Sequence, residues 1–230
     1  TIYSILLESY YNLSITLIEL LYLKKMNPIE ISNYIKYDNI ELIDELLKKG
    51  KGLLLLSGHY GNWEYLAFSA GTLTGKPLNI VVKPQKNKKL DRILNSYRTK
   101  NGNKIIPMNK AAIEIVRIIK NKGMVALLAD QAASKEKDIF VNFFGRPAVT
   151  YESPAKLALK FDIPIIIGFA ERQDNYKYKV HLQEIKYDDL KNEENAIELL
   201  TQRHVALLEE QIRKNPSQWA WQHNRWKYSK

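Results

Sequence analysis

A histidine and a glutamate five residues apart carry the clearest chemical signal in the sequence, in the stretch SGHYGNWE at residues 57–64. If a helix begins near Asn62, Glu64 lies in its first turn and can point back at the imidazole of His59. A carboxylate on one ring nitrogen fixes the tautomer, and the other nitrogen can then take a proton from a hydroxyl. The pair lacks a protein nucleophile, so we predict that this hydroxyl belongs to the substrate. The alternative is a histidine that ends a strand and makes one backbone hydrogen bond.

Glycines and a second acidic residue surround this pair. Gly58 and Gly61 flank His59 and predict a sharp turn or a close backbone approach. Asp130 follows the apolar run MVALLA, as His59 follows the run GLLLLS. Short apolar runs predict buried strands, and reactive groups of α/β sheets gather beyond the carboxyl ends of such strands. Asp130 could equally be only a helix cap or a turn residue.

The elements that must position these residues alternate along the chain. Runs of apolar or alternating residues predict strands at 52–57, 78–82, 104–108, 124–130, 163–170 and 176–185. Helical spacing predicts helices at 40–49, 62–73, 89–100, 111–121, 153–161 and 196–214. Continuous apolar strands need cover on both faces, so we predict an α/β fold with a mainly parallel central sheet flanked by helices on both faces. No linker divides residues 1–230, which we treat as a single domain.

Composition narrows the possible chemistry and partners. The chain has no cysteine, which excludes disulfides, thiolate metal sites and a thiol nucleophile. Its 35 Lys and Arg against 25 Asp and Glu give a net charge of +10. Such a basic surface favours an anionic partner, which could be nucleic acid, an anionic membrane face, an acidic carrier protein or a phosphorylated substrate. Charge alone does not choose among these.

The first 26 residues are rich in apolar and tyrosine side chains and predict a helix. Glu8 and Glu19 interrupt the stretch, which therefore falls short of the roughly 18 uninterrupted apolar residues of a membrane span. A helix packed on the body and a helix facing the membrane, with Lys24 and Lys25 following it, both remain open.

The stretch HYGNWE closely resembles the H-x4-D/E motif of the lysophospholipid-acyltransferase superfamily, in the form found in the lipid A biosynthesis lauroyl/myristoyl acyltransferases. Three further stretches are similar to that family in order and spacing, and the resemblance runs from about residue 27 to residue 227. They are ALLADQ, VNFFGRPAVTYESPAKLA and NPSQWAWQHNRWK. A bare H-x4-E is weak evidence, whereas four ordered segments together are specific.

The resemblance implies a glycerolipid-acyltransferase-like fold and acyl transfer from an acyl-carrier-protein thioester to a hydroxyl of a lipid A precursor. It makes His59 the general base and Glu64 its orienter, with no covalent enzyme intermediate, cofactor or metal. A different acceptor, such as a lysophospholipid or another glycolipid, stays open, as does a non-catalytic lipid-binding relative. Retention of both His59 and Glu64 argues against the latter.

The resemblance also implies a place in the cell and a set of binding residues. Relatives usually begin with a membrane-spanning helix, so we expect the cytoplasmic face of the inner membrane, with peripheral binding or with an anchor missing from this chain. The backbone amides of Gly61 and Asn62 and the cation of Arg98 are candidates to stabilise an oxyanion. Asp130 is expected to help hold the site. Arg146 could bind a phosphate or pair with a carboxylate.

Basic residues concentrate at positions 83–110, where Asp91 is the one acidic residue. Besides Arg98, the basic residues of this stretch are Lys83, Lys86, Lys88, Lys89, Arg92, Lys100, Lys104 and Lys110. The stretch is either a solvated helix face or a docking surface for an acidic carrier protein or lipid phosphates. A nucleic-acid-binding module is the rival interpretation. No nucleic-acid motif is present and the aromatic residues are not interleaved with these bases, so we expect no nucleic-acid partner.

The segment 215–230 is aromatic and basic. Its tryptophans predict either a lid packed on the core or an anchor at a bilayer interface, with Arg225 and Lys227 reaching headgroups. The resemblance places His223 and Arg225 near the site. Four other polar residues have no supporting constellation, and we interpret them as structural or as surface or core residues. They are Tyr151, Glu152, His181 and His204.

Overall fold

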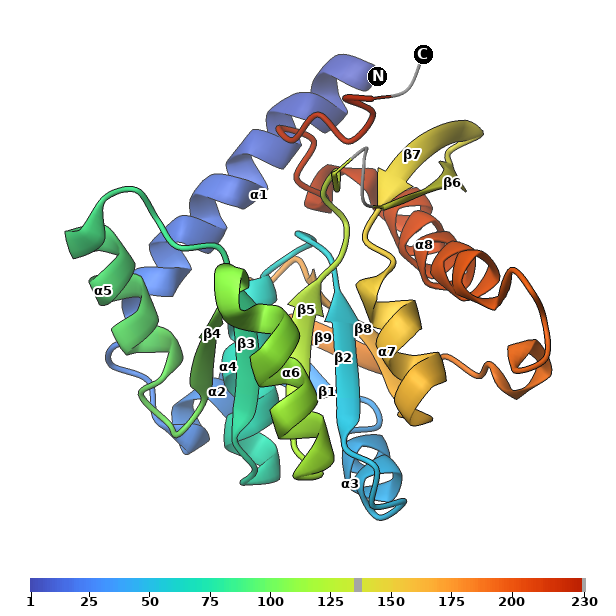
Figure 1. The fold of residues 1–230 in the computed structure, drawn as a ribbon. Coiled ribbons are helices and arrows are strands. Elements are labelled where there is room, and N and C mark those ends of the chain that lie inside the picture. Colours follow the sequence, from blue (N-terminus) through green and yellow to red (C-terminus); the bar gives the residue numbers. More distant parts are fainter. Residues whose placement is uncertain (135–137, 229–230) are drawn as a thin grey trace.

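The computed structural model describes residues 1–134 and 138–228, and within these it contains a seven-stranded sheet, a separate two-stranded hairpin and eight α-helices (Figure 1). The strands are β1 (Ile35–Tyr37), β2 (Leu53–Ser57), β3 (Leu78–Val82), β4 (Lys104–Pro107), β5 (Met124–Leu128), β6 (Ile139–Phe143), β7 (Arg146–Thr150), β8 (Ile165–Arg172) and β9 (Tyr178–Glu184). The helices are α1 (Ile2–Tyr22), α2 (Pro28–Tyr34), α3 (Glu41–Leu47), α4 (Trp63–Thr74), α5 (Lys88–Arg98), α6 (Ala111–Lys120), α7 (Ser153–Phe161) and α8 (Ala196–Lys214).

The large sheet has the strand order β1-β9-β8-β2-β5-β3-β4. Strands β8, β2, β5, β3 and β4 run parallel, and β9 pairs antiparallel with β8. The chain leaves β2, crosses over β5 through α4, and returns to the sheet as β3. The carboxyl ends of β2 and β5 therefore lie side by side at one edge, where α/β sheets form their ligand sites.

Helices cover both faces of the sheet, and each face has its own apolar core. Alternate residues of β2 divide between the cores: Leu54 and Leu56 pack on the side of α6, α7 and α8, whereas Leu53 and Leu55 pack on the side of α2 and α4. This alternation follows from the two-residue period of a strand. The predicted α/β fold with a mainly parallel sheet and helices on both faces is confirmed.

Helix α1 packs with its polar side against the body of the protein. Ser9 donates a hydrogen bond to the carbonyl of Trp219 at 2.6 Å, and Thr16 donates one to the carbonyl of Gly61 at 2.9 Å. Glu19 pairs with Arg172, with 2.9 Å between the nearest nitrogen and oxygen. Most apolar and tyrosine side chains of α1 face outward, whereas Leu20 is buried in the core on the side of α2 and α4. No helix in the described ranges is both long enough and apolar enough to cross a membrane.

Three features of the fold were not predicted. The stretch 139–150 forms the β6–β7 hairpin beside α8, outside the large sheet. Residues 28–37 form α2 and the short edge strand β1. Asn27 caps α2 together with Glu30 in a capping box, a signal that the sequence did contain.

Candidate active site

The neighbouring strands β2 and β5 bring His59 and Asp130 together. Ser57 lies opposite Leu128 at the ends of the two strands, and the amide of Ala129 donates to the carbonyl of Ser57 at 3.0 Å. Two residues beyond Ser57 and Leu128, His59 Nδ1 lies 2.8 Å from Asp130 Oδ1. The pairing of two adjacent parallel strands thus fixes this contact.

Asp130 accepts hydrogen bonds at both carboxylate oxygens and is almost fully buried. Its Oδ2 accepts from the backbone amide of His59 at 2.8 Å and from Trp219 Nε1 at 2.9 Å. The ring of Trp63 lies edge-on to the imidazole, with 5.0 Å between the ring centres. These contacts fix the orientation of the imidazole and leave Nε2 without a hydrogen-bond partner among the described residues.

The electrostatics of this pair favour a charged His59 and an ionised Asp130. Burial alone would lower the pKa of His59, but the charge and hydrogen bond of Asp130 raise it above its ordinary value. Burial alone would raise the pKa of Asp130, but the charge of His59 and the hydrogen bonds from His59 and Trp219 lower it. The histidine is therefore a stronger base than a free imidazole.

Glu64 does not make the contact that the sequence predicted. It lies in the first turn of α4, as expected, but its carboxylate forms a two-pronged ion pair with Arg98 of α5, with 2.8 Å from Arg98 Nε to Glu64 Oε2. Trp63 occupies the side of the helix turn next to the imidazole, and the guanidinium fork matches a carboxylate geometrically. Asp130 takes the place on the imidazole that was predicted for Glu64. Glu64 still acts on His59 through its charge, which contributes to raising the pKa of His59.

The backbone amides of Gly61 and Asn62 are not free to bind an oxyanion. Gly61 N donates to the carbonyl of Gln218 at 2.9 Å, and Asn62 N donates to the carbonyl of Ala170 at 3.1 Å. The loop runs so close to β8 that a Cβ on Gly61 would lie 1.8 Å from the Ala170 carbonyl oxygen, and Gly61 has a positive φ of 55°. Glycine is required here for a close backbone approach, as predicted, while Asn62 caps α4 through the amide of Tyr65.

An apolar cavity of about 860 Å³ opens at His59. Its polar lining includes His59, Glu64, Arg98, Gln131 and His223. The rest of the wall is mainly aliphatic and comes largely from β2, β3, β5, β8, β9, α4, α6 and α7. Cavities of this size with a few convergent polar groups are typical ligand sites.

His223 is a second histidine at this cavity. Its Nε2 accepts a hydrogen bond from the backbone amide of Ala132 at 2.9 Å, so a neutral ring carries its proton on Nδ1. Burial lowers the pKa of His223, which favours the neutral form. The site therefore holds one imidazole whose pKa is raised and one whose pKa is lowered, and the ring of His223, when neutral, can donate a hydrogen bond from Nδ1.

The two arginines Arg146 and Arg225, predicted as site residues, lie away from the cavity lining. Arg225 is buried beneath the C-terminal segment, where its guanidinium donates to the carbonyl of Val149 and to the hydroxyl of Thr150, so it cannot reach a headgroup. Arg146 lies exposed on β7, 5.4 Å from the ring centre of Trp226. The C-terminal segment packs on the core, as its lid interpretation predicted, because Trp219 is buried and donates a hydrogen bond to Asp130.

The other polar residues considered in the sequence lie in the core, on the surface or at the cavity wall. His204 is buried in α8, and burial lowers its pKa to about 4. His181 is exposed on β9. Tyr151, interpreted as structural, lines the cavity. No group of three or more His, Asp or Glu among the described residues is placed to hold a metal ion.

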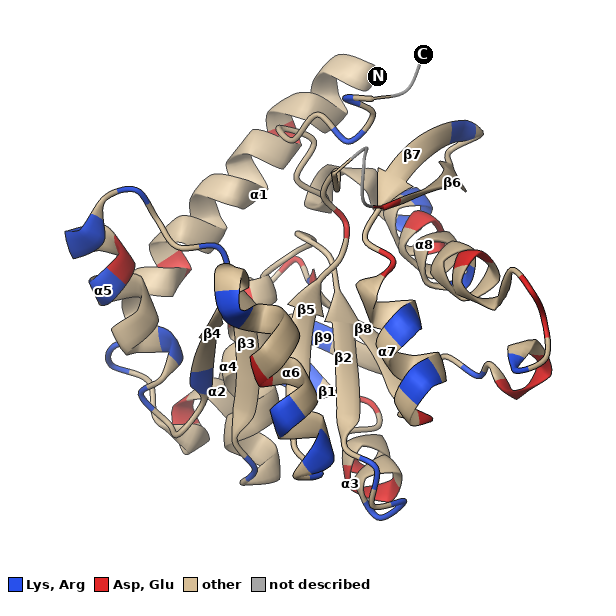
Figure 2. Cartoon of the chain, in the orientation of Figure 1, with Lys and Arg blue, Asp and Glu red and all other residues tan. Residues whose placement is uncertain are grey.

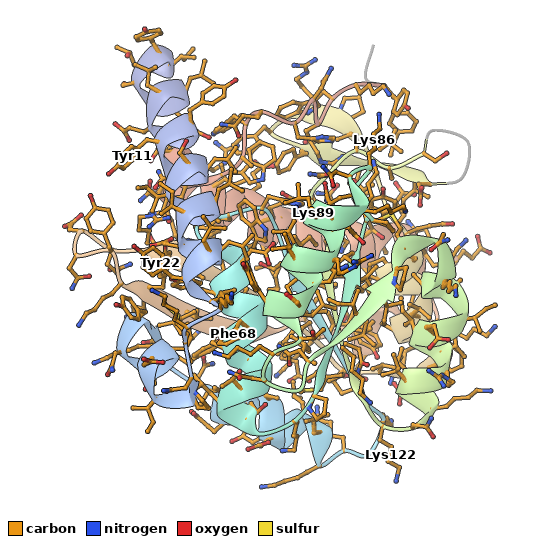
Figure 3. All side chains as sticks on the ribbon, turned by 90° about the vertical axis from the view of Figure 1, so that its left-hand side faces the viewer. Tyr11, Tyr22, Phe68, Lys86, Lys89 and Lys122 are labelled. Atoms are coloured by element: carbon orange, nitrogen blue, oxygen red, sulfur yellow. The ribbon has the colours of Figure 1, made fainter. Side chains whose placement is uncertain are left out.

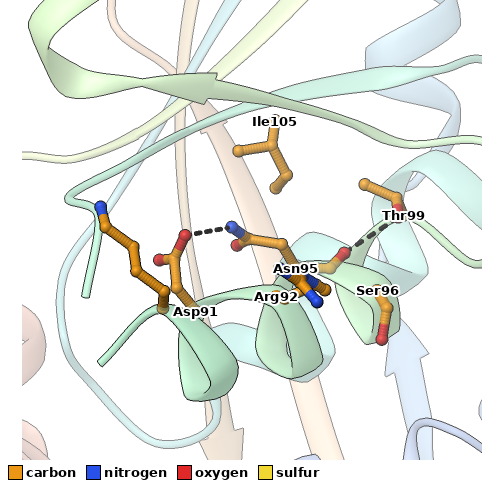
Figure 4. A pocket seen from close by; sticks show the side chains of 7 residues that line it. Asp91, Arg92, Asn95, Ser96, Thr99 and Ile105 are labelled. Carbon is orange, nitrogen blue, oxygen red and sulfur yellow. Dashed lines mark hydrogen bonds between the residues drawn. The ribbon is translucent and has the colours of Figure 1, made fainter. Parts of the chain in front are cut away.

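A second hollow, of about 640 Å³, lies between α5 and β4 (Figure 4). Its lining includes the cations of Lys88 and Arg92 and the carboxylate of Asp91, which accepts a hydrogen bond from Asn95 at 3.3 Å. Figure 2 shows Lys and Arg along α5 and the loop before it. None of the cations of Lys86, Lys88 and Arg92 lies within ion-pair distance of a described carboxylate.

Trp219 is the residue of the candidate site that sequence reasoning placed least well, since it was assigned to a lid and not to the Asp130 carboxylate. Its signal was the buried aromatic pattern of the C-terminal segment, but its partner lies 89 positions earlier in the chain.

A family model described as bacterial lipid A biosynthesis acyltransferase matches residues 3–228. A comparison with curated proteins gives no match for the chain.

Proposed function

The chain belongs to the bacterial lipid A biosynthesis acyltransferase family, and we propose that it moves a fatty acyl group from an acyl-carrier-protein thioester to a hydroxyl of a lipid A precursor. The observation that carries this proposal is the His59–Asp130 pair at the mouth of an apolar cavity. A base without a protein nucleophile suits a substrate hydroxyl, and an aliphatic cavity suits an acyl chain.

In the proposed reaction, His59 Nε2 takes the proton from the acceptor hydroxyl as its oxygen attacks the thioester carbon. A carbon–oxygen bond forms and the carbon–sulfur bond breaks. The imidazolium then returns its proton to the departing thiolate, so no oxidant or reductant is needed. Asp130 holds the ring through Nδ1 and stabilises the positive charge that forms.

Two side chains at the cavity replace the backbone amides as candidates for stabilising the developing oxyanion. His223 can donate from Nδ1 while its Nε2 is held by the amide of Ala132. Arg98 brings a positive charge whose position Glu64 fixes. In this arrangement Glu64 acts by positioning Arg98, whereas His59 takes the proton and Asp130 contacts its ring.

The surface supports a carrier protein and a membrane as partners. The exposed cations at Lys86, Lys88, Lys89 and Arg92 give α5 a basic face beside the cavity rim, which suits an acidic carrier protein. The apolar outer side of α1 suits a membrane interface. These two surfaces support the proposal that the protein acts at the cytoplasmic face of the inner membrane.

The function is tested by mass spectrometry of the lipids formed from acyl-carrier thioesters and candidate acceptors, including a lipid A precursor and a lysophospholipid. The wild-type protein is expected to acylate the lipid A precursor. His59→Gln is expected to lower the rate by ~10²–10⁴-fold, the usual contribution of a positioned base. His223→Phe, which cannot donate from Nδ1, is expected to lower kcat more than it raises KM.

Circular dichroism and thermal unfolding of each variant separate a chemical effect from a folding defect. A His59→Gln protein that is folded and transfers acyl groups at the wild-type rate would remove His59 from the base role. A wild-type protein that acylates only the lysophospholipid would reassign the acceptor.

A further inference from the structure

Two consecutive residues of the C-terminal segment hold both members of the His59–Asp130 pair. The indole Nε1 of Trp219 donates a hydrogen bond to Asp130 Oδ2 at 2.9 Å, and the amide of Ala220 donates one to the carbonyl of His59 at 2.9 Å. Tyr60 and Trp219 also form an antiparallel bridge. The segment therefore lies along the loop after β2 like an added strand, and it directs the indole at the carboxylate.

The indole of Trp219 is fixed in this position from several sides. The residue is 1% exposed, and its ring packs edge-on against Phe143 of β6 and against Trp221. Its backbone carbonyl accepts a hydrogen bond from Ser9 of α1 at 2.6 Å. Contacts with β6, with α1 and within the C-terminal segment thus hold the N–H group on its acceptor.

Asp130 depends on this N–H group because it is buried without a permanently charged partner. Its hydrogen-bond donors among the described residues are the ring and amide of His59 and the indole of Trp219. Burying a carboxylate is costly unless its charge is compensated. Once the ring of His59 has gained a second proton, the Nδ1 proton can pass to Asp130 and leave two neutral groups. A neutral imidazole is a poor acid, so it would not return a proton to the departing thiolate.

We propose that Trp219 is a positioning residue for the acyl transfer and acts through Asp130. Its N–H occupies Oδ2 and takes up part of the carboxylate charge, so Oδ1 stays on the ring and the ring keeps both protons after it has taken one from the acceptor hydroxyl. The imidazolium then returns one proton to the thiolate. This inference rests on the proposed function and adds that the C-terminal segment sets the strength of the base.

Trp219→Phe is expected to move the rising limb of kcat/KM to higher pH. Phenylalanine fills most of the space of the indole but does not donate, so Asp130 Oδ2 keeps only the amide of His59. The carboxylate then carries more charge toward the ring and holds the proton of the imidazolium more strongly. We expect a shift of roughly 0.4–1 pH unit, which is the size of the net contribution of one hydrogen bond.

Trp221→Phe is the matched control, because it removes an indole N–H two residues along the same segment. That N–H donates to the carbonyl of Pro216 at 2.7 Å and is not bonded to Asp130. Its rising limb is expected at the wild-type pH. Other charged or titratable groups act on the pair from α4, α5 and the C-terminal segment, and both variants retain them. They are Glu64, Arg98, His223 and Arg225.

NMR of the wild-type protein provides the same test without a substitution in the core. The indole N–H signals and the ring signals of His59 are followed as the pH is varied, and the two tryptophan variants assign the indole signals. The Trp219 signal is expected to move with the same midpoint as the ring of His59, because both donate to Asp130. The Trp221 signal is expected to stay constant over this range.

The outcomes separate this inference from the proposed function. A wild-type protein that transfers no acyl group contradicts the proposed function, whereas the NMR titration still tests the contact. A folded Trp219→Phe protein whose limb stays at the wild-type pH, or moves to lower pH, contradicts the inference. A Trp219 signal that does not follow the titration of His59 also contradicts it, whether or not the variant folds.

Discussion

Two buried carboxylates lie near the His59 imidazole, and they differ in what they contact. Asp130 accepts hydrogen bonds from the ring and the backbone of His59 and from Trp219. Both carboxylate oxygens of Glu64 accept hydrogen bonds from Arg98. Both charges raise the pKa of His59, but Asp130 does so through a hydrogen bond as well as through charge. Asp130 is therefore the stronger determinant of the basicity and orientation of the ring.

The pH dependence of kcat/KM tests this difference. A base works in its neutral form, so kcat/KM is expected to rise with pH through a pKa above 6.5, the ordinary value for His59. Asp130→Asn removes the main stabiliser of the imidazolium. Its rising limb is expected to move to lower pH, with a lower maximal rate because the ring is held less well.

Glu64→Gln is the comparison variant for this experiment. It removes the weaker charge and loosens Arg98, so its rising limb is expected to move less than that of Asp130→Asn. A larger shift in Glu64→Gln than in Asp130→Asn would return the orienting role to Glu64.

The contrast between these carboxylates marks what the sequence could predict at single residues. The five-residue spacing placed Glu64 correctly in the first turn of α4. The partner of Glu64 depends on where α5 places Arg98, and a local sequence pattern does not predict the position of another helix. Asp130 was placed at the end of its strand, but its contact with His59 depends on β2 and β5 being neighbours, which is a property of strand order.

At the scale of elements, α1 is joined to the active-site loop through its polar side. Thr16 holds the carbonyl of Gly61, and Glu19 accepts from the side chain of Asn62 at 2.8 Å. Glu19 also pairs with Arg172, whose side chain is only 7% exposed. The helix therefore braces the loop that carries His59.

Removing the Glu19 carboxylate is expected to destabilise the fold. Glu19→Ala leaves the buried guanidinium of Arg172 without its charge partner. The free energy of unfolding, measured by urea denaturation, is expected to fall by ~3–5 kcal/mol, the usual cost of breaking a buried ion pair. Glu8→Ala on the same helix removes an exposed glutamate and is expected to change it by less than about 0.5 kcal/mol. Equal losses in the two variants would mean that α1 does not brace the loop through Glu19.

The elements themselves were predictable where the pattern is local. Apolar runs identified β2, β3, β5 and β8 because buried parallel strands are continuous in apolar residues. The β6–β7 hairpin was missed because its register depends on a turn at Phe144 and Gly145, both with positive φ, and on α8 covering one side. The sequence did not predict that β9 runs antiparallel to β8, because alternating apolar and polar residues indicate which side of a strand is exposed and not the direction in which it runs.

At the scale of the whole molecule, α1 and α5 together form one face, which is apolar over α1 and basic over α5. The outer side of α1 exposes large apolar and aromatic residues, including Leu17, Leu21 and Tyr22, each more than 50% exposed. Figure 3 shows Tyr11 and Tyr22 on α1 and, beside it, Lys86 in the loop before α5 and Lys89 on α5. The helix directs its polar side inward and its apolar side outward, the reverse of a helix on a soluble surface. A face of this kind suits an anionic bilayer.

Binding to lipid vesicles tests whether this face contacts a membrane and through which part. Replacing both Leu17 and Leu21 by Gln should weaken binding to vesicles of mixed zwitterionic and anionic lipid by at least about tenfold, since each buried leucine contributes roughly 1.5–3 kcal/mol. This loss should persist at high salt, because it removes apolar contact. Replacing Lys86 and Lys89 by Glu should weaken binding only at low salt, since surface charges are screened.

Ile113→Gln, which removes an even more exposed apolar residue from α6, is the control and should bind vesicles as the wild type does. The fold of the double leucine variant should be unchanged, because neither side chain packs on the body. Vesicle binding that survives this variant but is lost in the lysine variant would mean that charge, and not α1, holds the protein at the membrane. In that case the cavity would face the bilayer through α5 and its basic rim.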